Sequence, residues 1–153
     1  MLIEGTEGAD SIRLGDEVDH FPGLIFEVYG YGGDDDIHVN TGTSTVYGGD
    51  GNDILRGGFD SDTMYGEDGD DTIFFLTPYG PDFGYGGDGD DTFSFIEHVK
   101  VDNQYAIHMD GGSGSDTIIL INERNQTRII DLSTGTYGDL ITFTSIENVI
   151  GTR

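Results

Sequence analysis

The sequence predicts an all-β fold built from a short repeat, and three observations carry this prediction. A nine-residue pattern recurs along the chain, glycine and aspartate dominate its first six places, and an apolar residue stands at its eighth place. Glycine reaches backbone conformations that tight turns require. An apolar residue between polar neighbours is typical of a strand with one buried face. Each repeat is therefore expected to form a turn followed by a short strand.

The most regular copies of the pattern lie within residues 30–94, and GGDGNDILR at 48–56 is typical of them. Seven copies keep Asp at the sixth place and an apolar residue at the eighth, and they begin at residues 5, 30, 48, 57, 66, 86 and 111. A degenerate copy, VNTGTSTVY at 39–47, keeps only the fourth-place glycine and the apolar eighth place. This regularity is too specific to be low complexity, and it indicates a repeat architecture.

The charge of the chain favours cations as partners. Six Lys and Arg stand against 30 Asp and Glu, which gives a formal net charge of −24 over 153 residues. Such self-repulsion opposes a compact state. It also excludes nucleic acid and anionic membranes as partners, because both require an excess of basic residues. Cysteine is absent and no apolar run has the length of a transmembrane segment, so disulfides, thiol chemistry and a membrane span are not expected.

The repeat G-G-x-G-x-D-x-U-x resembles the calcium-binding nonapeptide of RTX proteins. The resemblance is closest over 30–94, returns at 111–119 and is looser elsewhere. It implies a right-handed parallel β-roll with calcium-filled turns, formed as a single domain over 1–153. In this fold six residues turn and three form a strand, so that two nonapeptides complete one coil. EF-hand loops are the rival calcium motif, but no acidic stretch here has their spacing of ligands, central Gly and closing Glu.

The spacing of the copies assigns the turns to two edges of such a roll. Turns that begin at 5, 30, 48, 66, 86 and 111 share a first edge, and the longer steps between them are expected to be absorbed by loops within 14–29, 75–85 and 95–110. The sixth-place residues of the first edge are Asp10, Asp35, Asp53, Asp71, Asp91 and Asp116. The second edge has one good turn, which ends at Asp62; Ser44 stands where Asp is expected, and 75–85 has lost the repeat.

The resemblance implies that each Ca²⁺ lies between stacked turns, held by alternate backbone carbonyls and by the sixth-place aspartates of both turns. Three to five ions are expected along the first edge, and one or none along the second. The candidate metal-binding residues are Thr6, Gly8, Asp10, Gly30, Tyr31, Gly32, Gly33, Asp35, Gly48, Gly49, Asp50, Gly51, Asp53, Asp62, Gly66, Glu67, Asp68, Gly69, Asp71, Gly86, Gly87, Asp88, Gly89, Asp91, Gly111, Ser113 and Asp116.

The same register predicts two ladders of side chains. Ile37, Leu55, Ile73 and Phe93 should stack inside the roll and face Val28, Val46 and Met64. Tyr29, Tyr47, Tyr65 and Tyr85 each precede a first-edge turn and should lie on the outer surface of neighbouring strands. The tyrosines have two interpretations, stacking that stabilises the sheet or a platform for a sugar or another flat ligand.

The sequence pattern changes after residue 119, where longer apolar runs replace the repeat. TIILI (117–121), TRIIDL (127–132) and LITFTSIENVI (140–150) are interpreted as longer, more apolar strands. The last resembles the segment that often precedes a fresh block of RTX repeats, and Gly151 and Thr152 match the start of the first repeat. Residues 120–153 are thus expected to lead toward another repeat, in a chain that is a fragment of a longer protein.

No catalytic constellation emerges from the sequence. His20, His38, His98 and His108 are scattered and form no H-E-x-x-H motif. Neither a nucleophile elbow nor a phosphate-binding loop is present. The repeat accounts for nearly all paired carboxylates, and a remaining pair, Asp16 and Asp19, is interpreted as a solvated loop. We therefore expect no enzymatic activity in this chain.

The resemblance implies a calcium-dependent folding module of a secreted bacterial protein, exported unfolded by the type I secretion machinery and folded by calcium outside the cell or at its surface. The N-terminus lacks the basic and apolar regions of a cleavable signal peptide, which agrees with such a route. The alternative is a calcium-dependent adhesin or polysaccharide-binding module that uses the tyrosines or the long loops. Part of a secreted hydrolase is the third possibility.

Overall fold

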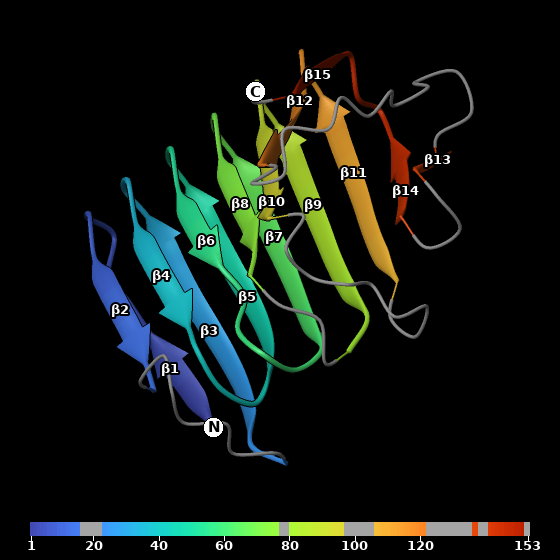
Figure 1. Ribbon diagram of the computed structural model, residues 1–153. Helices are drawn as coiled ribbons and strands as arrows, with labels where there is room; N and C mark the ends of the chain where they lie inside the picture. The colour runs from blue at the N-terminus through green and yellow to red at the C-terminus, as the bar shows by residue number, and fades with distance from the viewer. Residues whose placement is uncertain (16–22, 77–79, 97–105, 122–135, 138–140, 152–153) are drawn as a thin grey trace.

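The computed structural model describes residues 1–15, 23–76, 80–96, 106–121, 136–137 and 141–151, and every regular element in these ranges is a β-strand (Figure 1). The strands form two sheets. Sheet A contains, in spatial order, β1 (Leu2–Glu4), β3 (Ile25–Gly32), β5 (Thr43–Asp50), β7 (Asp62–Asp68), β9 (Asp82–Asp88), β11 (Ile107–Ser113), β14 (Ile141–Thr144) and β13 (Thr136–Tyr137). Sheet B contains β2 (Ser11–Leu14), β4 (Asp36–Val39), β6 (Ile54–Arg56), β8 (Thr72–Phe75), β10 (Thr92–Ile96), β12 (Thr117–Ile121) and β15 (Asn148–Gly151).

The order of the strands is that of a coil. From β1 to β12 the chain alternates between the sheets. Each strand from β1 to β10 pairs with the strand two positions further along the chain, whereas β11 pairs with β14 and β12 with β15. All pairings are parallel except that of β13 with β14. In Figure 1 the two sheets lie face to face with their strands running in opposite directions, as a coil requires. The parallel β-roll expected from the sequence is confirmed.

The predicted core ladders are also confirmed. In sheet B, Ile37 pairs with Leu55, Leu55 with Ile73, and Ile73 with Phe93, and none of the four is exposed. In sheet A, Val28, Val46 and Met64 occupy one register row and are at most 1% exposed. Strand alternation turns these side chains inward while their chain neighbours face outward. Burying them provides the hydrophobic stabilisation of the roll.

The sheet A row continues past Met64 through a glycine. Gly84 pairs with Met64 and Met109, so a side chain is missing from the core at this point. A Cβ on Gly84 would lie 2.6 Å from the Phe75 ring and 3.2 Å from the Phe93 ring. Two phenylalanines of sheet B therefore fill the space that an eighth-place apolar side chain occupies in the other coils.

The strands differ in length from the three residues expected. The second and third places of five first-edge turns still pair with the neighbouring coil, so that β3, β5, β7, β9 and β11 include the first three places of these turns and have seven or eight residues. Pairing of Gly49 with Glu67 and of Asp50 with Asp68 shows why: these places continue the ladder with the next coil. The strands of sheet B have three to five residues.

Three other expectations require correction or stay open. The loops predicted within 14–29 and 75–85 are shorter, because Ile25 and Asp82 already begin β3 and β9. Segment 117–121 is a strand as expected, but 140–150 is not one strand: it contributes β14 to sheet A and β15 to sheet B, with a turn between them. Segment 127–132 and most of the 95–110 loop lie outside the described residues.

A charge in the core ladder should abolish folding. In Ile73→Asp an ionised carboxylate replaces a side chain that is not exposed at all, at a cost on the order of several kcal/mol, and its register partners Leu55 and Phe93 are apolar. Circular dichroism of this variant should show no β-rich state at any calcium concentration. Ile73→Val, which costs about 0.5–1.5 kcal/mol, serves as the control and should keep its calcium response. A calcium response like that of the wild type in Ile73→Asp would show that the register is wrong.

Candidate metal centre

Six aspartates form a hydrogen-bonded column along the first edge, and we call them the aspartate column. In each case the backbone N–H of one sixth-place Asp donates to Oδ1 of the sixth-place Asp in the following turn. The donor and acceptor pairs are Asp10 and Asp35 (2.7 Å), Asp35 and Asp53 (2.8 Å), Asp53 and Asp71 (2.8 Å), Asp71 and Asp91 (2.9 Å), and Asp91 and Asp116 (2.8 Å). The longer steps from 5 to 30 and from 86 to 111 therefore do not interrupt the stack.

The second carboxylate oxygen of the column is buried without a hydrogen-bond partner in five turns. This holds for Oδ2 of Asp35, Asp53, Asp71, Asp91 and Asp116. A buried polar atom without a partner is costly, and an ionised one more so. The first turn differs, because Oδ2 of Asp10 accepts from the backbone N–H of Thr6 (2.6 Å) and from its hydroxyl (3.0 Å). The single proton of the Thr6 hydroxyl is shared with the carbonyl of Gly8, which is also 3.0 Å away.

A second oxygen faces each of these unpartnered atoms. A Cβ built on Gly48 would lie closer than 3.0 Å to both Asp53 Oδ2 and the carbonyl oxygen of Gly66. A Cβ on other first-place glycines would meet the same two oxygens, the Oδ2 of its own turn and the first-place carbonyl of the next turn. This holds for Gly30, Gly66, Gly86 and Gly111; at Gly111 the carbonyl belongs to Ser145. Carboxylate and carbonyl oxygens are the ligands that Ca²⁺ prefers. The residues present thus fit a calcium ion between successive turns.

The other two glycine places of the turn have a different role. Second-place Gly49, Gly87 and Gly112 and fourth-place Gly51 and Gly69 all have positive φ, between 97° and 135°. Tyr31 and Glu67, which replace second-place glycines, are held at φ values of 78° and 80°. This conformation is strained for residues other than glycine. The stack therefore imposes the turn shape even where the sequence departs from the repeat.

Third-place carbonyls join successive turns. The backbone N–H of Gly51 donates to the carbonyl of Asp68 (2.8 Å), and that of Gly69 donates to the carbonyl of Asp88 (2.8 Å). The carbonyls of Asp50 and Ser113 accept in the same way, from Gly33 (2.7 Å) and Gly89 (2.8 Å). Each of these oxygens keeps a second lone pair, so this bond does not prevent it from also binding a cation.

Burial shifts the acidity of the column. It raises the pKa of the Asp53 carboxyl to about 6, that of Asp91 to about 7 and that of Asp71 to about 8. It also raises the pKa of Asp35 and of Asp116. Desolvation is the main cause, and nearby carboxylates add to it, whereas the hydrogen bond from the preceding aspartate N–H acts in the opposite direction. Without a cation, the folded column resists being charged.

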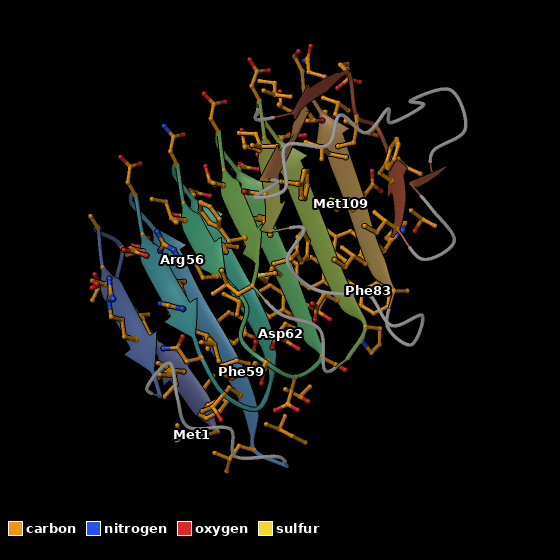
Figure 2. All side chains as sticks on the ribbon, in the orientation of Figure 1. Met1, Arg56, Phe59, Asp62, Phe83 and Met109 are labelled. Carbon is orange, nitrogen blue, oxygen red and sulfur yellow. The ribbon has the colours of Figure 1, made fainter. Side chains whose placement is uncertain are left out.

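The second edge has a different sixth-place row. Its members are Phe26, Ser44, Asp62, Asp82, Ile107 and Ile141. Both oxygens of Asp62 accept hydrogen bonds: Oδ1 from the backbone N–H and hydroxyl of Ser44 (2.9 and 2.6 Å), and Oδ2 from the backbone N–H of Gly58 (2.7 Å). Asp62 begins β7, at the lower end of the strand in Figure 2. Its carboxylate is thus satisfied by the protein itself, unlike the column on the first edge.

Two residues of these rows were missed from the sequence. Asp82 accepts from the backbone N–H of Asp62 (3.0 Å), so the expectation that 75–85 has lost the repeat is wrong for its second half. Gly80 and Asp82 keep the fourth and sixth places, but Gly84 at the eighth place concealed the copy. Glu147 accepts from the backbone N–H of Asp116 (2.7 Å) and extends the aspartate column by one turn. No nine-residue copy contains Glu147, so the repeat could not reveal it.

Carboxylates alone do not make the site. Among the described residues no group of three or more His, Cys, Asp or Glu side chains is arranged to hold a metal ion. His108 lies on the outer surface, where Nδ1 and the Thr142 hydroxyl are 2.8 Å apart. His20, His98, Asp16 and Asp19 lie outside the described residues. The part of the chain that the structure describes contains no helix with the length and apolar character of a membrane span.

The four predicted tyrosines stack on one another along the outer surface of sheet A. Ring centroids of Tyr29 and Tyr47, Tyr47 and Tyr65, and Tyr65 and Tyr85 are 4.7, 5.0 and 4.9 Å apart, with interplanar angles of 9°, 7° and 10°. A flat ligand would need the ring faces, but the neighbouring rings cover most of them. The geometry favours the stabilising interpretation, and the ligand platform stays a prediction.

Stacked acidic turns with converging carboxylate and carbonyl oxygens define a calcium-binding β-roll. The model of the RTX calcium-binding nonapeptide repeat matches the chain in four copies, over residues 47–75 and 79–94. These residues are RTX calcium-binding repeats, and the chain carries a calcium-binding module. A comparison with curated proteins gives no match.

The raised pKa values predict how pH affects the calcium-free chain. Asp53, Asp91 and Asp71 keep their protons in the folded state up to pH values of about 6 to 8, whereas an unfolded Asp loses its proton near about 3.9. The folded state binds more protons, so its stability should fall as pH rises through this window. Circular dichroism of calcium-depleted protein should show more β structure at pH 5 than at pH 8.

The control is Asp71→Asn, which mimics the protonated carboxyl and should reduce this pH dependence. In saturating calcium the trend should reverse, because protons compete with the cation for the same oxygens. Identical spectra of the calcium-depleted wild type at pH 5 and pH 8 would contradict the prediction.

Proposed function

We propose that this chain is a module that is largely disordered without calcium and folds when it binds calcium outside the cell. The observation that carries the proposal is the row of five buried Oδ2 atoms without a hydrogen-bond partner, at Asp35, Asp53, Asp71, Asp91 and Asp116. With all five ionised and no cation, their desolvation opposes folding together with the net charge of −24. A cation between the turns removes this cost, so its binding free energy becomes folding free energy.

The ligands proposed for one ion come from two turns. One turn supplies its second- and fourth-place carbonyls and its sixth-place carboxylate. The next turn supplies its first- and third-place carbonyls and its sixth-place carboxylate. The best site combines Gly49, Gly51, Asp53, Gly66, Asp68 and Asp71. The convergence of Asp53 Oδ2 and the Gly66 carbonyl supports this assignment. Repeating it along the unpartnered carboxylates gives three to five ions on the first edge.

The coupling of folding to calcium binding suits a secreted protein. Extracellular calcium modules bind with dissociation constants of about 10⁻⁴ to 10⁻³ M, so a chain of this design stays unfolded at low intracellular calcium. We infer export of the unfolded chain by type I secretion and folding at the destination. The RTX repeats support this route, since proteins with such repeats are typically secreted.

Calcium titration followed by circular dichroism tests the proposal. The calcium-depleted chain at pH 8 should lack β structure and should become β-rich at sub-millimolar to millimolar calcium. Magnesium should substitute poorly, because it demands smaller sites of near-octahedral geometry. A chain that is equally folded in calcium and in excess chelator would refute the proposal.

The two edges should respond differently to the loss of one aspartate. Asp53→Ala removes a carboxylate that bridges two neighbouring turns, so it should disturb two ions and markedly weaken calcium binding. Asp62→Ala is the matched variant: it removes a carboxylate that is equally buried but is already satisfied by Ser44 and Gly58. Bound ions counted by native mass spectrometry in saturating calcium should be two fewer than wild type in Asp53→Ala, and at most one fewer in Asp62→Ala. Equal losses would contradict the assignment of ions to the first edge.

A further inference from the structure

The fifth-place residues of the first edge form a second hydrogen-bonded ladder beside the aspartate column. In each step a fifth-place side chain accepts from the backbone N–H of the fifth-place residue in the following turn. The acceptor and donor pairs are Asp34 and Asn52 (2.9 Å), Asn52 and Asp70 (2.9 Å), Asp70 and Asp90 (2.8 Å), and Asp90 and Ser115 (2.9 Å). The Ser115 hydroxyl then accepts from the side-chain amide of Asn148 (3.1 Å). We call these residues the fifth-place ladder.

This ladder runs in the opposite direction to the aspartate column. The backbone N–H of Asp70 donates to the side chain of the preceding turn, at Asn52, whereas the N–H of the next residue, Asp71, donates to the side chain of the following turn, at Asp91. Each middle turn is therefore tied to both neighbours through two successive peptide groups. In the folded roll these bonds set the distance between turns, and they involve protein groups alone.

The composition of the two rows shows that they meet different requirements. Every member of the aspartate column is a carboxylate, and so is its extension Glu147. The fifth-place ladder contains Asp, Asn and Ser, and Asn52 in its middle both donates and accepts like its acidic neighbours. The ladder thus needs an acceptor oxygen and not a negative charge. Its side chains are exposed, whereas the column from Asp35 to Asp116 is buried.

We propose that the fifth-place ladder is a positioning device for calcium binding. Ca²⁺ requires oxygens from two turns at about 2.3–2.6 Å, and in the folded roll the ladder sets the spacing between turns at which these oxygens converge. Asp34, Asn52, Asp70 and Asp90 act through the turn spacing and do not contact the ion. This inference rests on the proposed placement of calcium between first-edge turns.

Three variants at adjacent positions separate the two rows, and each removes one negative charge. Asp70→Asn keeps the acceptor and should bind calcium within about twofold of wild type. Asp70→Ala removes the acceptor and should raise the calcium midpoint about three- to tenfold, the range expected from the loss of one hydrogen bond. Asp71→Asn alters a proposed ligand and should reduce the number of bound ions, which both Asp70 variants should leave unchanged.

A lifetime measurement distinguishes positioning from a general loss of stability. The luminescence lifetime of Tb³⁺, used as a calcium substitute and compared in H₂O and D₂O, reports how many water molecules remain on the bound ion. Asp70→Ala should admit more water at saturation, whereas Asp70→Asn and the destabilised core control Ile73→Val should match wild type. If Asp70→Ala fails to fold in saturating calcium, Asp34→Ala and Asp34→Asn provide the same comparison at the end of the ladder.

The inference is overturned if Asp70→Asn is as impaired as Asp70→Ala, because charge would then matter and not the acceptor. It is also overturned if Asp70→Ala matches wild type in both midpoint and lifetime. A wild-type chain that binds no calcium would instead refute the proposed function on which the inference rests.

Discussion

The structure depends on the burial of aspartate carboxylates between stacked turns. One oxygen of each carboxylate in the column from Asp35 to Asp116 accepts a backbone N–H and so holds the preceding turn, while the other has no hydrogen-bond partner among the described residues. The first oxygen makes the stack possible and the second makes it unfavourable when charged. A divalent cation resolves this conflict, because its charge and its preference for oxygen suit the site that the turns leave. In the proposed function, stability and calcium binding are therefore two aspects of one arrangement.

The glycines of the turn have two different structural roles. First-place glycines leave room for the oxygens, since a Cβ at Gly48 would collide with Asp53 Oδ2 and the Gly66 carbonyl. Glycines at the second and fourth places supply positive φ. At these places of the described turns, Tyr31 and Glu67 are the only other residues with positive φ. Such a glycine-rich chain loses much conformational entropy on folding. The hydrophobic ladders between the sheets offset part of this loss, and in the proposed function the bound cations offset a further part.

The asymmetry of the roll has a local cause. On the first edge every turn ends in a carboxylate, whereas the second-edge row begins with Phe26 and Ser44 and ends with Ile107 and Ile141. In the middle of this row, hydrogen bonds from Ser44 and Gly58 satisfy the carboxylate of Asp62. A roll needs both edges to turn the chain, but in the proposed function only the first edge carries ions. The second edge is thereby left free to vary in length and composition.

Much of this protein was determined by the sequence itself. The nine-residue period set the parallel roll, the core ladder from Ile37 to Phe93 and the aspartate column, because a strand with alternating faces and a glycine turn of fixed length leave one register for stacking. The stacked tyrosines followed from the same register. These features depend on local spacing, which a single sequence displays in full.

Other features were decided only by the tertiary structure, because they arise between turns that are distant along the chain. Asp82 belongs to the second-edge row although Gly84 breaks its repeat, since Phe75 and Phe93 fill the missing volume from the opposite sheet. Glu147 extends the aspartate column from a turn too short to match the repeat. The fifth-place ladder was concealed because Asp, Asn and Ser look variable in sequence, and only the stacked backbone shows that all three supply the same acceptor oxygen to the next turn.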